Sequence, residues 1–255
     1  MKPVVVKMNQ TSGKVRPPAK KPAGSPARKV RPAAGVAPAD LSFPVIAMAA
    51  SVGGLEALSV ILGGLPAGFP AAIAIVMHLS PDHKSILAEI LSRRTALMVR
   101  QAHTGDVLSP SCVFVAPPNR HLSVGPGGRL KLSSAEAKKV HYARPSAEPL
   151  FASVAAIYGR SAVAVVLTGG DGDGSFGVRI IKDHGGKVIA QDRPTSLDFS
   201  MPQTSIQTGE VDFILPLEEI APKLVDLVRP GRRSAAATRH PRNSKSSSAV
   251  RVLPK

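Results

Sequence analysis

Three polar side chains with complementary chemistry each follow an apolar run of the sequence: Ser51, His78 and Asp173. A serine hydroxyl is a weak nucleophile until a base accepts its proton, and histidine is the usual base near neutral pH. An aspartate that accepts a hydrogen bond from the second imidazole nitrogen fixes the tautomer and stabilises the imidazolium ion. These residue types therefore predict a catalytic triad, provided that the fold brings them to one place.

Ser51 stands between an apolar run at 45–50 and two glycines, Gly53 and Gly54, after which helical periodicity begins. A short apolar run bounded by turn residues predicts a buried strand of a parallel sheet. Ser51 would then lie at the carboxyl end of a strand and the start of a helix, where open parallel sheets bind ligands. A nucleophile, a helix cap and a ligand of a phosphate group all fit that place.

Asp171 and Asp173 lie in the glycine-rich segment 168–174, directly after the apolar run 162–167. Two neighbouring carboxylates suit a divalent cation, but the sequence offers no third acidic ligand, so we predict no metal site. The segment also lacks the spacing of a phosphate-binding loop, and we predict no cofactor. For single residues the structural alternatives are a turn or capping role for Asp173 and a hydrogen-bonded position at a strand end for His78.

Apolar runs alternate with helical periodicity along the middle of the chain. This alternation predicts an α/β fold: a three-layer, doubly wound, mainly parallel sheet with a β-hairpin insertion. If the strands that precede Ser51, His78 and Asp171 are neighbours, their polar ends meet in one crevice. The predicted strands cover about 45–50, 70–77, 97–101, 112–116, 162–167, 187–191 and 211–215, and the hairpin covers 121–124 and 129–132. The predicted helices cover about 54–64, 84–94, 146–158, a segment that ends near 184, a segment that begins near 203, and 217–228.

The net charge of +16 is confined to the two ends of the chain. Residues 1–42 hold nine Lys/Arg, seven prolines, seven alanines and one acid, and residues 229–255 hold eight Lys/Arg and no acid. The remaining segment, 43–228, carries 16 basic and 16 acidic side chains. Because the ends lack the residues of a core, we predict two disordered basic tails around one folded domain at 43–228. The tails suit nonspecific contact with nucleic acid or an anionic membrane, and a solvated tail without a partner is the alternative.

Cys112 is the single cysteine of the chain, which excludes an internal disulfide and a cysteine-based metal site. No apolar run approaches the ~20 residues of a membrane-spanning helix. The apolar part of the amino-terminal segment, Val4 to Val6, is too short for a secretory signal. We therefore expect a cytoplasmic protein.

Beyond the triad, six segments occur in an order that is typical of one enzyme family. They are Ala50-Ser51-Val52-Gly53-Gly54, His78 after its strand, Val115 to His121, Arg144-Pro145-Ser146 with Leu150-Phe151, Leu167 to Gly174, and Met201-Pro202. Through these segments the chain resembles the catalytic domain of the chemotaxis protein-glutamate methylesterases. The resemblance covers about 44–228, which is essentially the whole predicted domain.

The resemblance implies hydrolysis of γ-glutamyl methyl esters on the cytoplasmic helices of methylated chemoreceptors, and deamidation of particular glutamines. Both reactions transfer an acyl group to water, so one site can serve both. By position, Ser51 would be the nucleophile, His78 the base and Asp173 the residue that orients it. The backbone amides of Val52 and Gly170 would hold the oxyanion.

The sequence departs from the family pattern in three respects. The 42 residues before the domain are too few for the receiver domain of ~100 residues that usually precedes it, so we expect a stand-alone enzyme. Ala49 and Val52 stand where the family typically has glycine and threonine. Asp171 stands where it usually has glycine, and its carboxylate is expected to disfavour ionisation of Asp173 or to repel an acidic substrate.

A second hypothesis is a docking protein of the same fold without catalytic activity, which the basic tails tether to nucleic acid or membrane. Asp171 is the feature that keeps this second hypothesis open beside the enzyme. Labelling of Ser51 by a serine-reactive fluorophosphonate would distinguish the two, because only an activated serine reacts.

Deletion of both tails, 1–42 and 230–255, is expected to abolish any salt-sensitive binding of the chain to duplex DNA. These segments carry almost all of the excess positive charge, and phosphate contacts weaken steeply as salt is added. Fluorescence anisotropy with labelled DNA at low and high salt measures the effect. Binding that survives the deletion would contradict this assignment of the charge.

Overall fold

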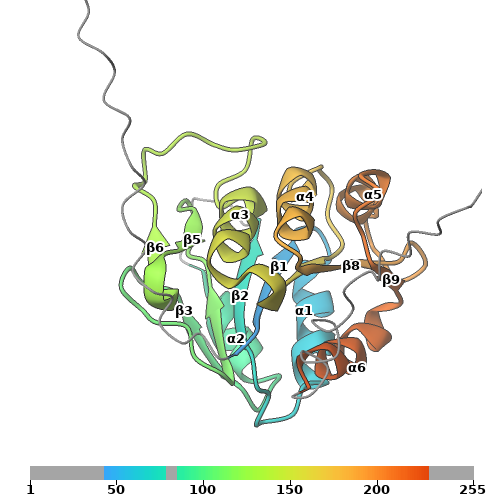
Figure 1. Ribbon diagram of the computed structural model, residues 1–255, viewed down its shortest axis with the longest axis horizontal. Helices are drawn as coiled ribbons and strands as arrows, with labels where there is room; N and C mark the ends of the chain where they lie inside the picture. The colour runs from blue at the N-terminus through green and yellow to red at the C-terminus, as the bar shows by residue number, and fades with distance from the viewer. Residues whose placement is uncertain (1–42, 79–84, 230–255) are drawn as a thin grey trace, which may run out of the picture. The chain divides into compact units, whose positions relative to one another are not determined.

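The computed structural model describes residues 43–78 and 85–229. In these residues one sheet of seven strands forms the centre of the fold, and every pair of neighbouring strands is parallel (Figure 1). The strands follow the order β3 (Met98–Gln101), β4 (Cys112–Val115), β2 (Ala72–Met77), β1 (Val45–Ala50), β7 (Ala162–Val166), β8 (Lys187–Gln191) and β9 (Phe213–Leu215). The predicted parallel α/β sheet is confirmed.

Strand β1 lies at the centre of the sheet, and all of its residues are buried. Its side chains alternate between the two faces: Ala47 and Ala49 belong to one apolar cluster, and Ile46 and Met48 belong to the other. Both faces of the strand are therefore covered, which explains why its sequence is an unbroken apolar run rather than an alternating pattern.

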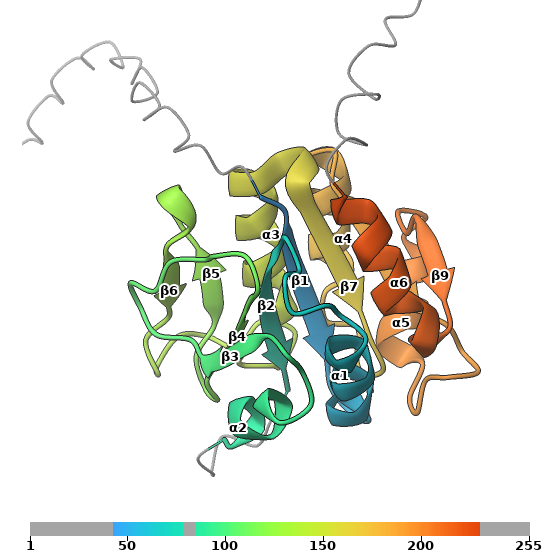
Figure 2. The ribbon, with the colours of Figure 1, turned by 90° about the horizontal axis from the view of Figure 1, so that it is seen from below.

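Helices cover both faces of the sheet, so the domain has the three predicted layers (Figures 1 and 2). One face carries α1 (Gly54–Gly63), α2 (Leu87–Ser92) and α6 (Leu217–Val228). The opposite face carries α3 (Ala147–Tyr158), α4 (Ser175–Asp183) and α5 (Ser200–Gln207). None of the helices in the described part of the chain has the length and apolar character needed to cross a bilayer.

The order in which the chain adds strands to the sheet changes direction at the boundary between β1 and β7. After β1 the chain moves to β2 through α1, and after β7 it moves to β8 on the other side through α4, which lies on the opposite face. Such a switch point opens a crevice beyond the carboxyl ends of the strands. Ser51 follows β1, His78 follows β2, and Asp171 lies in the loop after β7, so all three reach this crevice.

The predicted hairpin is present as a separate two-stranded antiparallel sheet. It pairs β5 (Leu122–Val124) with β6 (Leu130–Leu132). The buried side chains of Leu122 and Leu130 join the apolar cluster that also contains residues of α3. Two short 3₁₀ turns complete the described elements, η1 (Pro126–Gly128) and η2 (Gly159–Ser161).

Several predicted boundaries differ from the structure. Helix α5 begins at Ser200 rather than near 203, so Met201 and Pro202 lie inside it. Proline is tolerated there because the first turn of a helix needs no amide donor, and Asp198 accepts hydrogen bonds from the Ser200 amide and hydroxyl at 3.0 and 2.7 Å. Strand β9 is shorter than the predicted 211–215.

Three predictions fall wholly or partly outside the described residues. The predicted tail 1–42 lies wholly outside them, and only the first residue of the predicted tail 229–255 is described. The start of the helix predicted over 84–94 also lies outside them, and the described helix α2 covers Leu87–Ser92.

The contact between α3 and α4 leaves no space for a side chain at Gly177. A Cβ atom there would lie 2.7 Å from Cβ of Phe151 and 2.8 Å from Oε2 of Glu148. We therefore expect Gly177→Ala to lower the free energy of unfolding by about 1–3 kcal/mol, although alanine is the better helix former by about 1 kcal/mol. Urea denaturation measures the change.

Gly68→Ala is the matched control, because no described atom lies within 4 Å of a Cβ added there. Its effect should stay within about 0.5 kcal/mol. An equal loss of stability in both variants would show that the close packing of α3 on α4 is not the cause.

Candidate active site

Ser51 is fixed at the end of β1 by backbone contacts to the loop after β7. Its amide donates to the carbonyl oxygen of Thr168 at 3.0 Å. A Cβ atom on Gly169 would lie 2.8 Å from Cβ of Ser51, so the two loops are in close contact. Gly53 adopts φ +78° as the cap of α1, a left-handed conformation that favours glycine. The predicted strand–turn–helix arrangement around Ser51 is confirmed.

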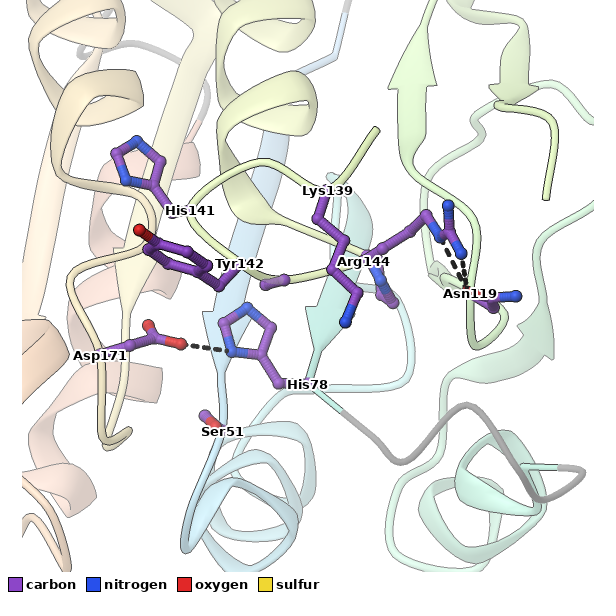
Figure 3. A pocket seen from close by; sticks show the side chains of 10 residues that line it. Ser51, His78, Asn119, Lys139, His141, Tyr142, Arg144 and Asp171 are labelled. Atoms are coloured by element: carbon purple, nitrogen blue, oxygen red, sulfur yellow. Dashed lines mark hydrogen bonds and ion pairs between the residues drawn. The ribbon is translucent and has the colours of Figure 1, made fainter. Parts of the chain in front are cut away.

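His78 is placed beside Ser51 by the pairing of β2 with β1. The amide of His78 donates to the carbonyl oxygen of Ala50 at 3.0 Å, one residue beyond the Ala50–Met77 pair. Ser51 and His78 line the same crevice, and the close-up shows the serine side chain next to the imidazole ring (Figure 3). The imidazole Nε2 lies 2.8 Å from Oδ2 of Asp173.

Asp173 is fully buried, and the start of helix α3 provides the donors that compensate for its burial. Its Oδ1 accepts a hydrogen bond from the Ser146 hydroxyl at 2.6 Å, and its Oδ2 accepts one from the Ala147 amide at 2.6 Å. The amino end of a helix favours a negative charge, and a buried carboxylate needs such donors to remain ionised. The geometry therefore suits a charged Asp173 that orients His78.

Asp171 contacts the other nitrogen of the same imidazole. Its Oδ2 lies 3.1 Å from Nδ1 of His78, a contact that Figure 3 marks with a dashed line, and its Oδ1 accepts from the Asp173 amide at 3.0 Å. Both ring nitrogens therefore face carboxylates. In the described residues, no hydrogen bond joins the Ser51 hydroxyl to His78.

These contacts change the protonation of the imidazole. Burial alone would lower the pKa of His78, but its contacts with Asp171 and Asp173 outweigh burial and raise the pKa from 6.5 to about 9. Burial would raise the pKa of Asp171, yet its contacts with His78 and with the Asp173 amide bring that pKa below its ordinary value. The favoured state near neutral pH is an imidazolium ion between two carboxylates.

The predicted oxyanion donors, Val52 and Gly170, lie in the two loops that meet at Ser51. In the described part of the chain the amides of these two residues make no hydrogen bond. Val52 is in the turn that leads into α1, one residue before the cap Gly53. Both donors are thus free to hold an oxyanion, and this role stays a prediction.

Thr168 is a site residue that the triad reasoning did not single out. Its buried hydroxyl donates to the carbonyl oxygens of Val52 at 2.8 Å and Asp198 at 3.1 Å, and it accepts from the Asp198 amide at 2.9 Å. Its own amide donates to Oε1 of Gln191 at 2.9 Å. This one side chain connects the loops after β1, β7 and β8. In the sequence it stood out only as part of the segment Leu167 to Gly174, directly after a buried strand.

Ser146 was predicted as the start of a helix but not as a partner of Asp173. Its hydroxyl caps α3 by accepting from the Glu148 amide at 3.2 Å while it donates to Asp173. Glu148 is buried in turn and accepts from the amides of Gly174 and Phe176 at 3.1 and 3.0 Å, and burial raises its pKa. The start of α3 thus fixes both Asp173 and the start of α4.

The loop between β6 and α3 forms the opposite wall of the crevice, as Figure 3 shows. Arg144 is anchored there, because its Nε donates to Oδ1 of Asn119 at 2.8 Å and another of its nitrogens donates to the carbonyl oxygen of Ala137. Lys139 and the exposed Tyr142 line the same wall. A substrate that reaches Ser51 therefore passes basic side chains.

A serine beside a histidine that a buried aspartate contacts is the arrangement that serine hydrolases use on unrelated folds. The fold and the site thus have the features of a serine hydrolase built on a doubly wound parallel sheet. The chain belongs to the CheB methylesterase family, whose profile matches residues 46–224.

Two relatives and one solved structure support this membership. A protein-glutamate methylesterase/protein-glutamine glutaminase of Anaeromyxobacter dehalogenans is 44% identical over 186 residues, which cover 72% of this chain and 53% of the relative. The protein-glutamate methylesterase FrzG of Myxococcus xanthus is 37% identical over 186 residues, which cover 73% and 55%. The CheB methylesterase catalytic domain of Thermotoga maritima superposes with a TM-score of 0.70 at 34% identity and covers 74% of this chain and 100% of that domain. The chain thus spans about half the length of the curated relatives it matches.

The hydrogen bond from Ser146 to Asp173 should support both stability and activity. We expect Ser146→Ala to lower the free energy of unfolding by about 1–3 kcal/mol, because the buried carboxylate loses a donor. The rate at which a fluorophosphonate labels Ser51 should fall as well, since Asp173 then holds His78 less firmly. Urea denaturation and the labelling rate measure the two effects.

Ser205→Ala is the control for this substitution. Ser205 is also buried, but its hydroxyl has no hydrogen-bond partner among the described residues. Its removal should therefore leave both quantities nearly unchanged. A similar result for the two variants would argue against a specific role for Ser146.

Proposed function

We propose that this protein is a protein-glutamate methylesterase that also deamidates protein glutamines, with Ser51 as nucleophile, His78 as base and Asp173 as the residue that orients the base. The names of its relatives and its membership of the CheB methylesterase family support the reaction class. The observation that carries the assignment of the residues is the contact of buried Asp173 with His78, next to Ser51.

The proposed substrate is a γ-glutamyl methyl ester on the cytoplasmic helices of methylated chemoreceptors, and the protein would act in the cytoplasm. The segment 43–228 is the proposed catalytic domain. The basic segments 1–42 and 229–255 are the proposed contacts to nucleic acid or to an anionic membrane, and their charge supports this role.

The reaction proceeds in two acyl transfers. The Ser51 oxygen attacks the ester carbonyl carbon while the neutral imidazole of His78 accepts the hydroxyl proton. The amides of Val52 and Gly170 hold the negative charge that develops on the carbonyl oxygen. When the intermediate collapses, the bond to the methoxy group breaks, and methanol leaves with the proton from His78.

Water completes the cycle by the same route. His78 accepts a proton from a water molecule as it attacks the acyl-enzyme, and His78 returns this proton to the Ser51 oxygen as the bond between that oxygen and the acyl carbon breaks. The products are the glutamate side chain and free enzyme. With a glutamine substrate, ammonia replaces methanol as the leaving group, and no other step changes.

Ser51→Ala is expected to abolish methanol release from methylated receptor membranes and labelling by a fluorophosphonate probe. Ser59→Ala serves as the control, because Ser59 lies on the exposed side of α1 and its hydroxyl donates to the Leu55 carbonyl oxygen at 2.7 Å. Methanol release that persists in Ser51→Ala would exclude Ser51 as the nucleophile. If the wild-type protein is not labelled by the probe at any pH and releases no methanol, the docking hypothesis is favoured instead.

Asp173→Asn should reduce the rate of ester hydrolysis by about 10⁴-fold, since the amide cannot stabilise the imidazolium ion and favours the wrong tautomer. Circular dichroism should show an unchanged fold. A rate within a factor of ten of the wild type would mean that another group orients His78.

A further inference from the structure

His78 lies between two carboxylates that differ in how firmly they are held. Asp173 is fully buried and accepts from the Ser146 hydroxyl and the Ala147 amide. The side chain of Asp171 is 40% exposed and borders the open crevice. Apart from His78, its only hydrogen bond in the described residues is the one it accepts from the Asp173 amide. Asp171 is therefore the carboxylate that can move away.

The position of Asp171 conflicts with a step of the proposed reaction. Asp173 occupies Nε2 of His78, so Nδ1 is the nitrogen that remains for the Ser51 hydroxyl. Oδ2 of Asp171 lies 3.1 Å from this Nδ1. A nitrogen that donates to a carboxylate cannot accept the serine proton at the same time. With this contact in place, Nδ1 of His78 is not available to the Ser51 hydroxyl.

We propose that Asp171 is a positioning residue that restrains the triad: it occupies the imidazole nitrogen that Ser51 needs, and Ser51 becomes a nucleophile only when Asp171 releases that nitrogen. This inference rests on the proposed esterase function. The inference explains how the proposed reaction is controlled. It also assigns a role to Asp171, the residue of the loop after β7 that departs from the family pattern.

The charge of Asp171 also determines which form of His78 prevails. Since the two carboxylates raise the pKa of His78 to about 9 against the opposing effect of burial, the ring is protonated at neutral pH and cannot act as a base. The neutral base forms as the pH rises through this value. Without Asp171 the ring keeps only one carboxylate partner, so its pKa falls and the base forms at lower pH.

Other ionisable groups border the crevice in the described part of the chain. Lys139, His141, Tyr142 and Arg144 reach it from the loop before α3. The positive charges of Lys139 and Arg144 act against protonation of His78, and His141 helps to lower the pKa of Asp171. Asp198, in the loop before α5, repels Asp171 but makes no contact with His78. All of these groups remain in place when Asp171 alone is changed.

Two substitutions of Asp171 in the full chain test the proposal. Asp171→Asn removes the charge and keeps an oxygen for the Asp173 amide, so the loop retains its hydrogen bond. Asp171→Gly removes the side chain altogether. The first measurement is the rate at which a fluorophosphonate labels Ser51 between about pH 6 and 10. This range includes the ordinary pKa of a histidine, 6.5, and the raised pKa of His78, about 9. The second is the titration of the His78 imidazole by NMR.

We expect the pH midpoint of both measurements to lie near 9 in the wild type and to fall by about 1–2 pH units in both variants. At pH 7 the variants should then label about ten- to a hundredfold faster, because one pH unit corresponds to a tenfold change in the fraction of neutral base. Asp198→Asn is the control, since it removes a carboxylate near the same crevice that does not touch His78. Its midpoints should stay those of the wild type.

The proposal is overturned if the His78 midpoint stays unchanged in both Asp171 variants, or if Asp198→Asn lowers it equally. It is also overturned if the midpoint falls but labelling at pH 7 does not accelerate, because Asp171 would then not restrain Ser51. Failure of the proposed function has a different signature: Ser51 would remain unlabelled at every pH in the wild type and in all variants. Rapid labelling of the variants at pH 7, together with labelling of the wild type that rises only toward pH 9, would support both proposals.

Discussion

The buried carboxylate of Asp173 is the group on which the arrangement of this site depends. An unpaired charge in a protein interior costs several kcal/mol, and its partners must therefore be in place for the fold to form. Its donors come from the Ser146 hydroxyl, the Ala147 amide and His78. The start of α3, the loop after β7 and the end of β2 are thus fixed to one another by one group. Glu148, also at the start of α3, is a second buried carboxylate whose burial is compensated by donors. It accepts hydrogen bonds from the amides of Gly174 and Phe176 at the start of α4.

The sheet places the remaining parts of the site around this carboxylate. Strands β1, β2 and β7 are neighbours, and their carboxyl ends point to one edge. Small side chains on β1, such as Ala47 and Ala49, lie on the face that α3 covers. Thr168 then joins the loops after β1, β7 and β8 through its hydroxyl and amide. Ser51, His78 and Asp173 are consequently held by the sheet and by the hydrogen bonds at the start of α3, whereas Asp171 borders the open side of the crevice.

Much of this could be predicted from the sequence, because the relevant signals are local. The apolar run at 45–50 and the glycines after Ser51 define a strand, a turn and a helix start, and the structure shows all three. The positions of His78 and Asp171 after apolar runs indicated that they would meet Ser51 at one edge of the sheet, as they do. The order of the strands could not be derived in this way, since it depends on packing between distant segments.

The predictions were incomplete where a side chain pairs with a distant one. The sequence around Ser146 predicts a helix start. Its hydrogen bond to Asp173 joins residues 27 positions apart, and no local sequence pattern predicts it. For Asp171 the sequence predicted an effect on Asp173 or on an acidic substrate. In the structure one of its oxygens accepts from the Asp173 amide, and the other consequently faces His78. Its proposed role as a restraint on the base became visible only with the geometry of the ring.

The central claim is that the crevice around Ser51 hydrolyses glutamyl methyl esters by acyl transfer to water. Mass spectrometry of methylated receptor membranes, incubated with the full chain in heavy-oxygen water, tests it most directly. The account predicts that each glutamate that loses its methyl group carries one oxygen from the solvent, and that Ser51→Ala prevents the loss. Esters that stay intact with the wild type, or that are cleaved equally by Ser51→Ala, would contradict it.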